Sequence, residues 1–385
     1  MGSDNVVVQY RLSFQQETVE RSVQLLLAEM TSGIQYVSTR KGVQMDRVQD
    51  TVPYVDTSVL GEVKTLEQIG DDEYRVAFAL PAANLDPGLG GLTNLWPVVA
   101  GEVFNFHFIK HACLEELMLP DAYESHYKGP GFGIGGVRKL VGVGEGPLFG
   151  SIIKPNIGLD PVRSADVVRI LSEAGFNFIK DDEICVSPSL CPLKERVEHI
   201  CSVLRTHRDH TGQTVLYAAN VTSDFSVLGR AAEIALQSGA GGLMIDPFCT
   251  GLSAMDYLRR NFDAPIYAHR VGYGLFCLSP NLSIDYSVFS GLFRLLGADF
   301  SHVGGLWGKS EASRLKTAGY LNILRDNASV EPAWPVVTGI SLENMEDYHS
   351  FYGDDTLFMD HIDIYRDVDS STEKLHMLKE KLIRS

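Results

Sequence analysis

A strand-like pattern followed by a helix-like pattern recurs eight times between residue 147 and the end of the chain. Each strand-like segment is a short apolar run, and helical spacing appears between them at 162–174, 193–205, 226–238 and 286–296. Eight such units predict an α/β fold of the TIM type, a closed (β/α)8 barrel. The alternative, an open doubly wound sheet, normally carries a G-x-G-x-x-G loop after its first strand, and none occurs there. The predicted strands are 148–154, 176–182, 214–221, 242–247, 265–271, 300–306, 335–340 and 356–360.

The first 110 residues or so have a different pattern. Residues 6–12 and 74–80 alternate as strands do, and residues 16–29 have helical spacing, so this part predicts a small α+β, ferredoxin-like domain. A glycine-rich stretch then leads into the barrel. We therefore expect an N-terminal domain at 1–115, a linker at 116–146 and a catalytic barrel at 147–385.

The second predicted barrel strand ends in four charged residues, Lys180-Asp181-Asp182-Glu183. Four charges cannot lie inside a core, so they must emerge at the C-terminal face of the barrel, where active sites are built. Alternation along the strand directs Lys180 and Asp182 to one side, and Glu183 can join them. Two convergent carboxylates favour Mg²⁺, and a carbamate formed from CO₂ on Lys180 would add a third oxygen ligand. A solvated acidic loop with Lys180 in a salt bridge remains the alternative on this segment alone.

Polar residues also stand at the ends of five other predicted strands. A single histidine or lysine at such a place is more often structural, but five strands contributing together predict an active site. These residues are Lys154 and Asn156, Asn220, His269 and Arg270, His302 with Lys309 in the loop that follows it, and Thr338 with Gly339.

The N-terminal domain offers two further candidates, both acidic. Glu29 stands at the end of a predicted helix, just before a turn, where it could equally be an ordinary surface residue. Glu102 is the one carboxylate in the apolar stretch 92–104. Because an acid is rarely buried without a partner, Glu102 is a candidate acid or base that faces a ligand.

Composition limits the partners and the compartment. A net charge of −16, without a cluster of basic residues, argues against nucleic acid as a partner. The six cysteines form no C-x-x-C pair, which is typical of reduced thiols. The start of the chain is polar, and no apolar run is long enough to cross a membrane, so we expect a cytoplasmic protein that binds a small molecule.

The segment Phe178-Ile179-Lys180-Asp181-Asp182-Glu183 resembles the metal site of the ribulose-bisphosphate carboxylase (Rubisco) large subunit, and the resemblance extends over the whole barrel and part of the first domain. It implies that Lys180 is carbamylated and holds Mg²⁺ together with Asp182 and Glu183. It also implies catalytic roles for Lys154 at the α-proton of the substrate and for His269 as an acid or base. Arg270, His302 and Thr338 would clamp one phosphate, with Gly339 and Asn220 nearby. Lys309 would close over the ligand and pair with Glu29 of a neighbouring subunit, which implies a homodimer with shared sites.

Several positions depart from the carboxylase. Asn156 replaces a second lysine, Glu102 replaces an asparagine, and Ile34-Gln35 replaces a Thr-Trp pair that contacts phosphate. The glycines after strand eight, whose amides receive the other phosphate, are replaced by the bulky and acidic segment 358–363. The chain is thus similar to the Rubisco-like (form IV) proteins and is not expected to carboxylate ribulose bisphosphate.

The resemblance implies an Mg²⁺-dependent enzyme that forms a metal-stabilised enolate from a phosphorylated, sugar-derived keto compound. Decarboxylation of a 3-oxo sugar-acid phosphate fits best, because it needs one phosphate at the Arg270 end and an acid at the metal end. Tautomerisation of the 2,3-diketo-5-methylthiopentyl-1-phosphate type and ketose-phosphate isomerisation are the enzymatic alternatives. A barrel that binds a sugar phosphate without turnover is the alternative of another class.

Overall fold

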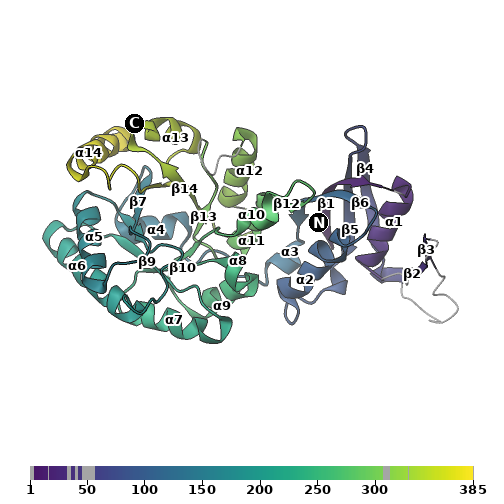
Figure 1. The fold of residues 1–385 in the computed structure, drawn as a ribbon, viewed down its shortest axis with the longest axis horizontal. Coiled ribbons are helices and arrows are strands. Elements are labelled where there is room, and N and C mark those ends of the chain that lie inside the picture. Colours follow the sequence, from purple (N-terminus) through teal and green to yellow (C-terminus); the bar gives the residue numbers. More distant parts are fainter. Residues whose placement is uncertain are drawn as a thin grey trace. The chain divides into compact units, whose positions relative to one another are not determined.

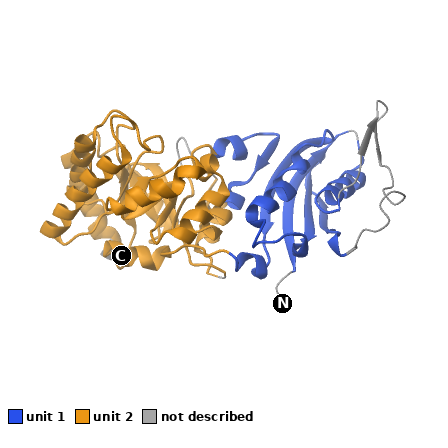
Figure 2. Ribbon diagram, turned by 90° about the horizontal axis from the view of Figure 1, so that it is seen from below, with its two compact units in different colours: residues 1–126, 273–289 blue, residues 127–272, 290–385 orange. Residues whose placement is uncertain are grey.

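The computed structural model describes residues 4–15, 17–32, 36–39, 42–45, 57–306, 313–327 and 329–384. The chain forms two compact units, one of residues 1–126 and 273–289, the other of residues 127–272 and 290–385 (Figure 2). These bounds differ from the predicted domains. The predicted linker is divided between the two units, and residues 273–289, which we placed in the barrel, belong to unit 1.

Unit 1 is built on a mixed five-stranded sheet with the order β12-β6-β1-β5-β4. Alternate residues of β1 are buried, as the period of its sequence predicts. The strand β12 pairs in parallel with β6 and comes from the chain segment that follows barrel strand β11, which explains the division of the chain. The strands are β1 (Asn5–Phe14), β4 (Glu62–Gln68), β5 (Tyr74–Pro81), β6 (Ile109–Met118) and β12 (Leu282–Ile284), with a separate pair β2 (Tyr36–Thr39) and β3 (Gly42–Met45). The helices are α1 (Val19–Glu29), α2 (Gly91–Ala100), α3 (Asp121–Glu124) and α10 (Tyr273–Cys277).

Unit 2 is a closed barrel of eight parallel strands, and all eight predicted strands are confirmed to within a few residues (Figure 1). Around the barrel the order is β10-β11-β13-β14-β15-β7-β8-β9, which sets β7 across from β11. The strands are β7 (Leu148–Ile152), β8 (Phe178–Lys180), β9 (Leu216–Asn220), β10 (Gly242–Ile245), β11 (Ile266–Ala268), β13 (Phe300–His302), β14 (Trp334–Ile340) and β15 (Leu357–Asp360).

Helices form a ring around these strands (Figure 1). Local sequence sets their ends. The side chain of Asp160, for example, accepts a hydrogen bond from the Arg163 amide and caps α5, and Pro161 occupies the first turn. The helices are α4 (Gly133–Val141), α5 (Pro161–Glu173), α6 (Leu193–Thr211), α7 (Phe225–Gln237), α8 (Pro247–Thr250), α9 (Leu252–Asn261), α11 (Tyr286–Leu295), α12 (Arg314–Arg325), α13 (Met345–Tyr352) and α14 (Val368–Arg384).

The barrel interior is a packed core rather than a channel. Aromatic side chains from opposite sides of the barrel meet in it: the rings of Phe178 on β8 and Phe300 on β13 lie 4.9 Å apart, and Tyr267 on β11 stacks on Phe178 at 5.6 Å. Val137 and Val141 of α4 join this core from the N-terminal ends of the strands. Function is therefore confined to the opposite, C-terminal face.

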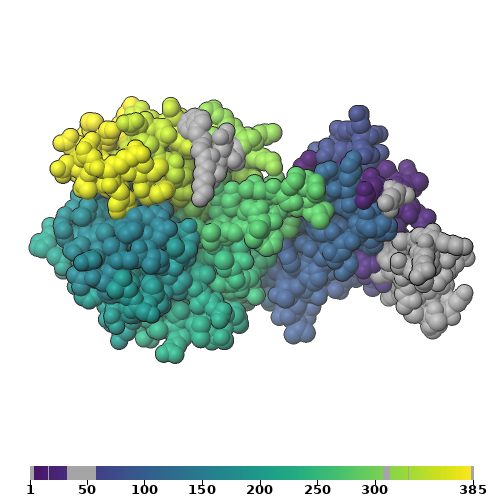
Figure 3. Space-filling view, viewed as in Figure 1, coloured from purple at the N-terminus to yellow at the C-terminus, as the bar shows by residue number. Residues whose placement is uncertain are grey.

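The last helix, α14, lies against the segment around β7 and α5 and is seen as the yellow surface beside the blue one in Figure 3. Lys379 donates a hydrogen bond to the Gly175 carbonyl, and its ammonium stands 5.7 Å from the Phe149 ring. Across the described ranges, no helix is both long and apolar enough to span a bilayer.

Candidate active site

The end of β8 carries the predicted metal ligands. Lys180 is fully buried, and its Nζ atom lies 4.0 Å from Oε2 of Glu183 and donates to the Asp181 carbonyl at 3.0 Å. Burial lowers the pKa of Lys180 to about 8, although the negative charges of Glu183 and Asp182 oppose this shift. A substantial fraction of this amine is therefore neutral near pH 8, which is the form that reacts with CO₂.

Lys154, just beyond β7, points at the same carboxylates. Its Nζ atom donates to Oδ2 of Asp182 at 2.6 Å and to Oδ1 of Asn156 at 2.7 Å. Oδ1 of Asp182 accepts the Ile184 amide at 3.2 Å, so both of its oxygens have donors. The structure thus brings Lys154, Lys180, Asp182 and Glu183 together from two adjacent strands.

The donor set at the end of β8 fits a hard divalent cation, provided that Lys180 carries a carbamate. Asp182 and Glu183 supply carboxylate oxygens, and Lys180, turned toward Glu183, can supply a third anionic oxygen only once it is modified. The described parts of the chain contain no group of three or more His, Cys, Asp or Glu side chains that could hold a metal ion. The lysine is therefore essential to this ligand set.

His269 follows β11 and lies between Glu183 and Asp246, an acid that we did not predict. Its Nε2 atom lies 3.6 Å from Oε2 of Glu183, and its Nδ1 atom lies 3.8 Å from Oδ2 of Asp246 and accepts the Val271 amide at 3.2 Å. Burial lowers the pKa of His269 well below its usual value, and the charge of Lys180 lowers it further. A neutral imidazole that accepts at Nδ1 carries its proton on Nε2, toward Glu183.

The predicted phosphate clamp lies beside His269. His302, at the end of β13, is buried with its ring 4.8 Å from that of His269, and its Nε2 atom is 2.7 Å from the Tyr267 hydroxyl. Arg270 is 7% exposed, and its charge is among the causes that lower the pKa of both histidines after burial. A guanidinium and two imidazoles at the ends of adjacent strands have the chemistry to hold an anion, so the phosphate clamp stays our prediction for this corner.

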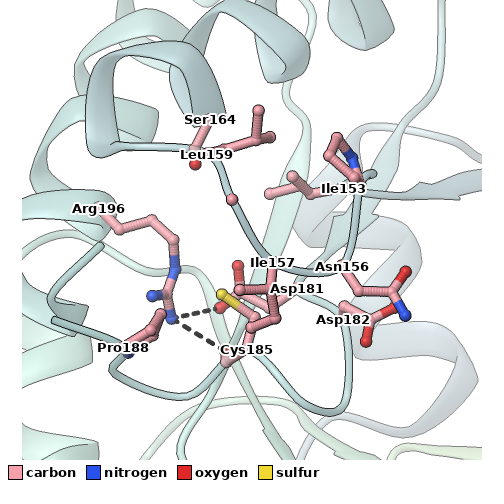
Figure 4. A pocket seen from close by; sticks show the side chains of 12 residues that line it. Ile153, Asn156, Ile157, Leu159, Ser164, Asp181, Asp182, Cys185, Pro188 and Arg196 are labelled. Carbon is pink, nitrogen blue, oxygen red and sulfur yellow. Dashed lines mark hydrogen bonds and ion pairs between the residues drawn. The ribbon is translucent and has the colours of Figure 1, made fainter. Parts of the chain in front are cut away.

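The Asp181 side chain points away from Lys180 and Asp182 and holds the loop after β8 in place. Its carboxylate accepts Nη2 of Arg196 at 3.0 Å, the Tyr217 hydroxyl at 2.8 Å and the Asn220 amide at 2.9 Å. Figure 4 shows Arg196 directed at Asp181 and Cys185 in a small pocket, whereas Asp182 lies near Asn156. Arg196 also donates to the carbonyls of Cys191, Cys185 and Val186, so it ties the loop after β8 to α6.

The side chain of Asn220 forms hydrogen bonds within the protein. Its Nδ2 atom donates to the carbonyls of Asp182 at 3.1 Å and Glu183 at 2.9 Å, and its Oδ1 atom accepts the Thr222 amide at 3.0 Å. All of its polar atoms are engaged by the protein. Asn220 therefore holds the backbone that carries Asp182 and Glu183, and its contact with a substrate stays a prediction.

The remaining predicted residues fall in three groups. Thr338, half-buried on β14, and Gly339, with φ of 72°, stand at the barrel mouth as expected. Lys309 lies outside the described residues. Glu29 ends α1. Glu102 is exposed at the start of a short 3₁₀ helix (Glu102–Phe104) rather than buried, because the apolar stretch before it forms α2, which ends at Ala100. Burial and then the charge of Glu102 raise the pKa of Glu29, so these two acids share one side of unit 1.

Sequence reasoning missed Asp246 and His361. Asp246 directly follows β10, so the strand-end argument that found His269 would have found it as well. Burial raises the pKa of Asp246 to about 7 despite the Phe248 and Cys249 amides that stabilise its charge. His361 directly follows β15, so the same strand-end argument would have found it too.

Comparison with known proteins places these residues in a family. Residues 133–345 match the ribulose bisphosphate carboxylase large chain, catalytic domain. The chain is 34% identical to the 3-oxo-isoapionate-4-phosphate transcarboxylase/hydrolase of Xanthobacter autotrophicus over 76% of this chain and 72% of that one. It is 33% identical to the 3-oxo-isoapionate-4-phosphate decarboxylase of Rhizobium rhizogenes over 60% of this chain and 54% of that one, so that match spans about half of the relative's length.

A solved structure resembles the entire fold. The crystal structure of a Rubisco-like protein from Burkholderia fungorum has a TM-score of 0.85 and 26% identity, and the match covers 99% of this chain and 94% of that one. The predicted resemblance is confirmed. The chain is therefore a Rubisco-like enzyme and belongs to the ribulose bisphosphate carboxylase large-chain family.

Proposed function

We propose that this enzyme decarboxylates a 3-oxo sugar acid that carries one phosphate, and that it does not carboxylate ribulose bisphosphate. Two similar proteins are named for activities on 3-oxo-isoapionate 4-phosphate, one as a decarboxylase and one as a transcarboxylase/hydrolase. That compound, or a close analogue with the same β-keto acid group, is the first substrate to test. The names guide the choice of substrate, and the residues of this chain have to account for the chemistry.

The observation that carries the proposal is the position of the Lys154 amine. It stands at hydrogen-bond distance from Asp182 and follows β7, the strand across the barrel from the one that His269 and Arg270 follow. A substrate held by its phosphate at Arg270 and His302 would extend toward β7 and β8. Its reacting carbons would then lie between the proton carried by Lys154 and the metal-binding carboxylates.

The chain's own residues can carry the reaction through. The bond between the carboxylate and the α-carbon breaks, CO₂ leaves, and the electron pair moves into the neighbouring keto group to give an enolate. The Lys154 ammonium then protonates the α-carbon, while Asn156 and Asp182 keep the amine in place. Mg²⁺, when bound by carbamylated Lys180, Asp182 and Glu183, supplies the positive charge that favours a developing enolate. Arg270 and His302 hold the phosphate at a fixed distance from the reacting carbons.

The test is to incubate the enzyme with 3-oxo-isoapionate 4-phosphate, Mg²⁺ and bicarbonate and to measure both CO₂ release and solvent deuterium in the product. We expect one CO₂ and one solvent-derived hydrogen per turnover, and a loss of about 10²-fold or more in kcat for Lys154→Met, which keeps the length of the side chain without its proton. Deuterium incorporation without CO₂ would favour tautomerisation or isomerisation. Consumption of the acid with neither CO₂ release nor deuterium incorporation would favour carboxyl transfer or hydrolysis. If no phosphorylated keto acid were turned over, the result would favour a binding protein.

We also expect activation by CO₂ to depend on pH. Because burial lowers the pKa of Lys180 to about 8, the neutral fraction of its amine rises about tenfold between pH 7 and pH 9. Preincubation at pH 7, 8 or 9 with equal dissolved CO₂ and Mg²⁺, followed by assay at one common pH, should give initial rates that rise with the preincubation pH. Preincubation without CO₂ is the control. Equal initial rates at all three values would show that the amine need not be neutral.

We propose a cytoplasmic homodimer. Glu29 and Glu102 lie together in unit 1, where a second subunit could use them as the family resemblance implies. Sedimentation of the Mg²⁺-loaded enzyme measures the assembly. A strictly monomeric enzyme with full activity would exclude a shared site.

A further inference from the structure

The backbone hydrogen bonds of β7 alternate between its two neighbouring strands. The Leu148 amide donates at 3.0 Å to a carbonyl just before β15, whereas the Ile153 amide donates at 3.0 Å to the Lys180 carbonyl of β8. In a parallel ladder, every second residue faces the same neighbour. The Ile152 carbonyl and the Lys154 amide are therefore the last groups of this segment that face the β15 side.

A tyrosine hydroxyl binds these two groups at the point where the pairing of strands stops. The ladder between β7 and β15 ends at Gly150 and Met359. Beyond it, the Tyr365 hydroxyl donates to the Ile152 carbonyl at 2.7 Å and accepts the Lys154 amide at 3.1 Å. One side-chain oxygen thus stands where the next residue of β15 would continue the ladder, and it holds the backbone of Lys154 on the side away from β8.

The loop that carries Tyr365 is itself fixed by two carboxylates. Asp360, fully buried at the end of β15, accepts the amides of Ile362 at 2.9 Å and Asp363 at 3.2 Å. Oδ2 of Asp363 accepts the Ser341 hydroxyl at 2.6 Å, which ties the loop to the chain just after β14. The position of the Tyr365 hydroxyl is therefore set by the fold, although the residue as a whole is 39% exposed.

The group whose position depends on this arrangement is the Lys154 amine. It donates to Oδ2 of Asp182 at 2.6 Å and to Oδ1 of Asn156 at 2.7 Å. Asn156 lies only two residues further along the chain, so it would move together with Lys154. A shift of the backbone at Lys154 would carry the amine away from Asp182, and a misplacement of about 1 Å at a reacting group can cost about 10²-fold in rate.

We propose that Tyr365 is a positioning residue: its hydroxyl completes the ladder of β7 and so holds the Lys154 amine at Asp182. Tyr365 acts through Lys154 and not on the substrate. The proposal rests on the proposed function only in that Lys154 carries the proton. Without the hydroxyl, water can satisfy the two backbone groups, because Tyr365 is partly exposed, but water does not tie them to the loop. The rate should therefore suffer more than the stability.

Tyr365→Phe removes the hydroxyl and keeps the ring. With Mg²⁺, bicarbonate and the substrate of the proposed function, we expect kcat to fall about tenfold and KM to stay within about twofold, because the phosphate is held elsewhere, at Arg270 and His302. Tyr123→Phe is the matched control and should keep the wild-type kcat, since it removes a hydroxyl that donates to the Gly91 carbonyl at 2.7 Å in unit 1. An unchanged kcat in Tyr365→Phe would overturn the proposal, and so would a raised KM at unchanged kcat.

A double-mutant cycle separates positioning from a merely structural role. If Tyr365 acts only through the amine, adding Tyr365→Phe to Lys154→Met should leave the residual kcat unchanged within about twofold. A further tenfold loss in the double variant would overturn the proposal. Thermal unfolding of each variant measures the folded fraction, and a Tyr365→Phe enzyme that lost rate only in proportion to that fraction would overturn it as well.

Crystal structures of the wild type and Tyr365→Phe, grown under the same conditions without substrate, test the position of the amine directly. We expect the Lys154 amine within hydrogen-bond distance of Asp182 in the wild type and displaced by about 1 Å or more in the variant. An amine in the same place in both would overturn the proposal. If the amine moves but the wild type releases no CO₂ from any keto acid, the decarboxylase function fails and the role of Tyr365 stands.

Discussion

Replacing Lys180 with alanine should abolish turnover. The variant loses the amine that would become the third anionic ligand, and Asp182 and Glu183 alone bind Mg²⁺ poorly. Without the cation the developing enolate loses its main electrostatic stabilisation, so we expect kcat/KM to fall by at least about 10³-fold, or roughly 4 kcal/mol of transition-state stabilisation. Steady-state kinetics over a range of substrate concentrations at a fixed high Mg²⁺ concentration measures this loss, and calorimetry measures the loss of Mg²⁺ affinity that should accompany it.

Lys180→Met is the matched control for packing, because it keeps the length of the side chain in a fully buried position and removes only the amine. It should be as inactive as Lys180→Ala. Wild-type enzyme incubated with ¹³C-labelled CO₂ should show a carbamate carbon by NMR that both variants lack. A Lys180→Met enzyme that kept activity within tenfold of the wild type would contradict the role of Lys180 as a carbamylated metal ligand. If the wild type showed no turnover and Lys180→Met still bound ribulose 5-phosphate, the protein would be a binding protein.

Most of this site could be predicted because barrel topology gathers strand ends. The sequence places Lys154, Lys180, His269 and His302 after separate apolar runs, and once eight parallel strands close, their C-terminal ends must meet. No knowledge of loop structure was needed for these four. The same reasoning located the carboxylates of Asp182 and Glu183, whose charges rule out a place in the core.

Features that depend on loop conformation or on remote partners could not be predicted. Asn220 stands at a strand end, but the loop after β8 folds so that its carbonyls use the Asn220 amide. Glu102 was expected to be buried because its neighbours are apolar, yet the helix that buries those neighbours ends just before it. The Asp181 and Arg196 pair joins a strand end to a helix that begins more than ten residues later, and no local pattern indicates such a contact.

At the other end of the barrel, Asp299→Ala should cause the largest loss of stability. Asp299 is fully buried just before β13 and accepts the amides of Phe132 at 2.7 Å, Gly133 at 2.8 Å and Ile266 at 2.8 Å. It is also the anionic partner of buried Arg259, at 3.4 Å. Removing it leaves a buried cation and three amides without their acceptor, so the free energy of unfolding should fall by about 3–5 kcal/mol. Denaturant unfolding followed by circular dichroism measures the change.

The neighbouring arginine supplies the control. Arg260 pairs with Asp256 at 2.7 Å on the same helix, where the two side chains are 34% and 22% exposed, so Asp256→Ala should cost less than about 1 kcal/mol. Asp299 lies at the N-terminal ends of the strands, away from Lys180. At low temperature Asp299→Ala should therefore keep its activity per folded molecule. Lys180→Met should show the opposite behaviour and keep its fold while it loses its activity. If Asp299→Ala lost turnover without losing stability, a residue at the N-terminal face would be needed for catalysis. That result would contradict the expectation that this face serves stability and the C-terminal face serves function.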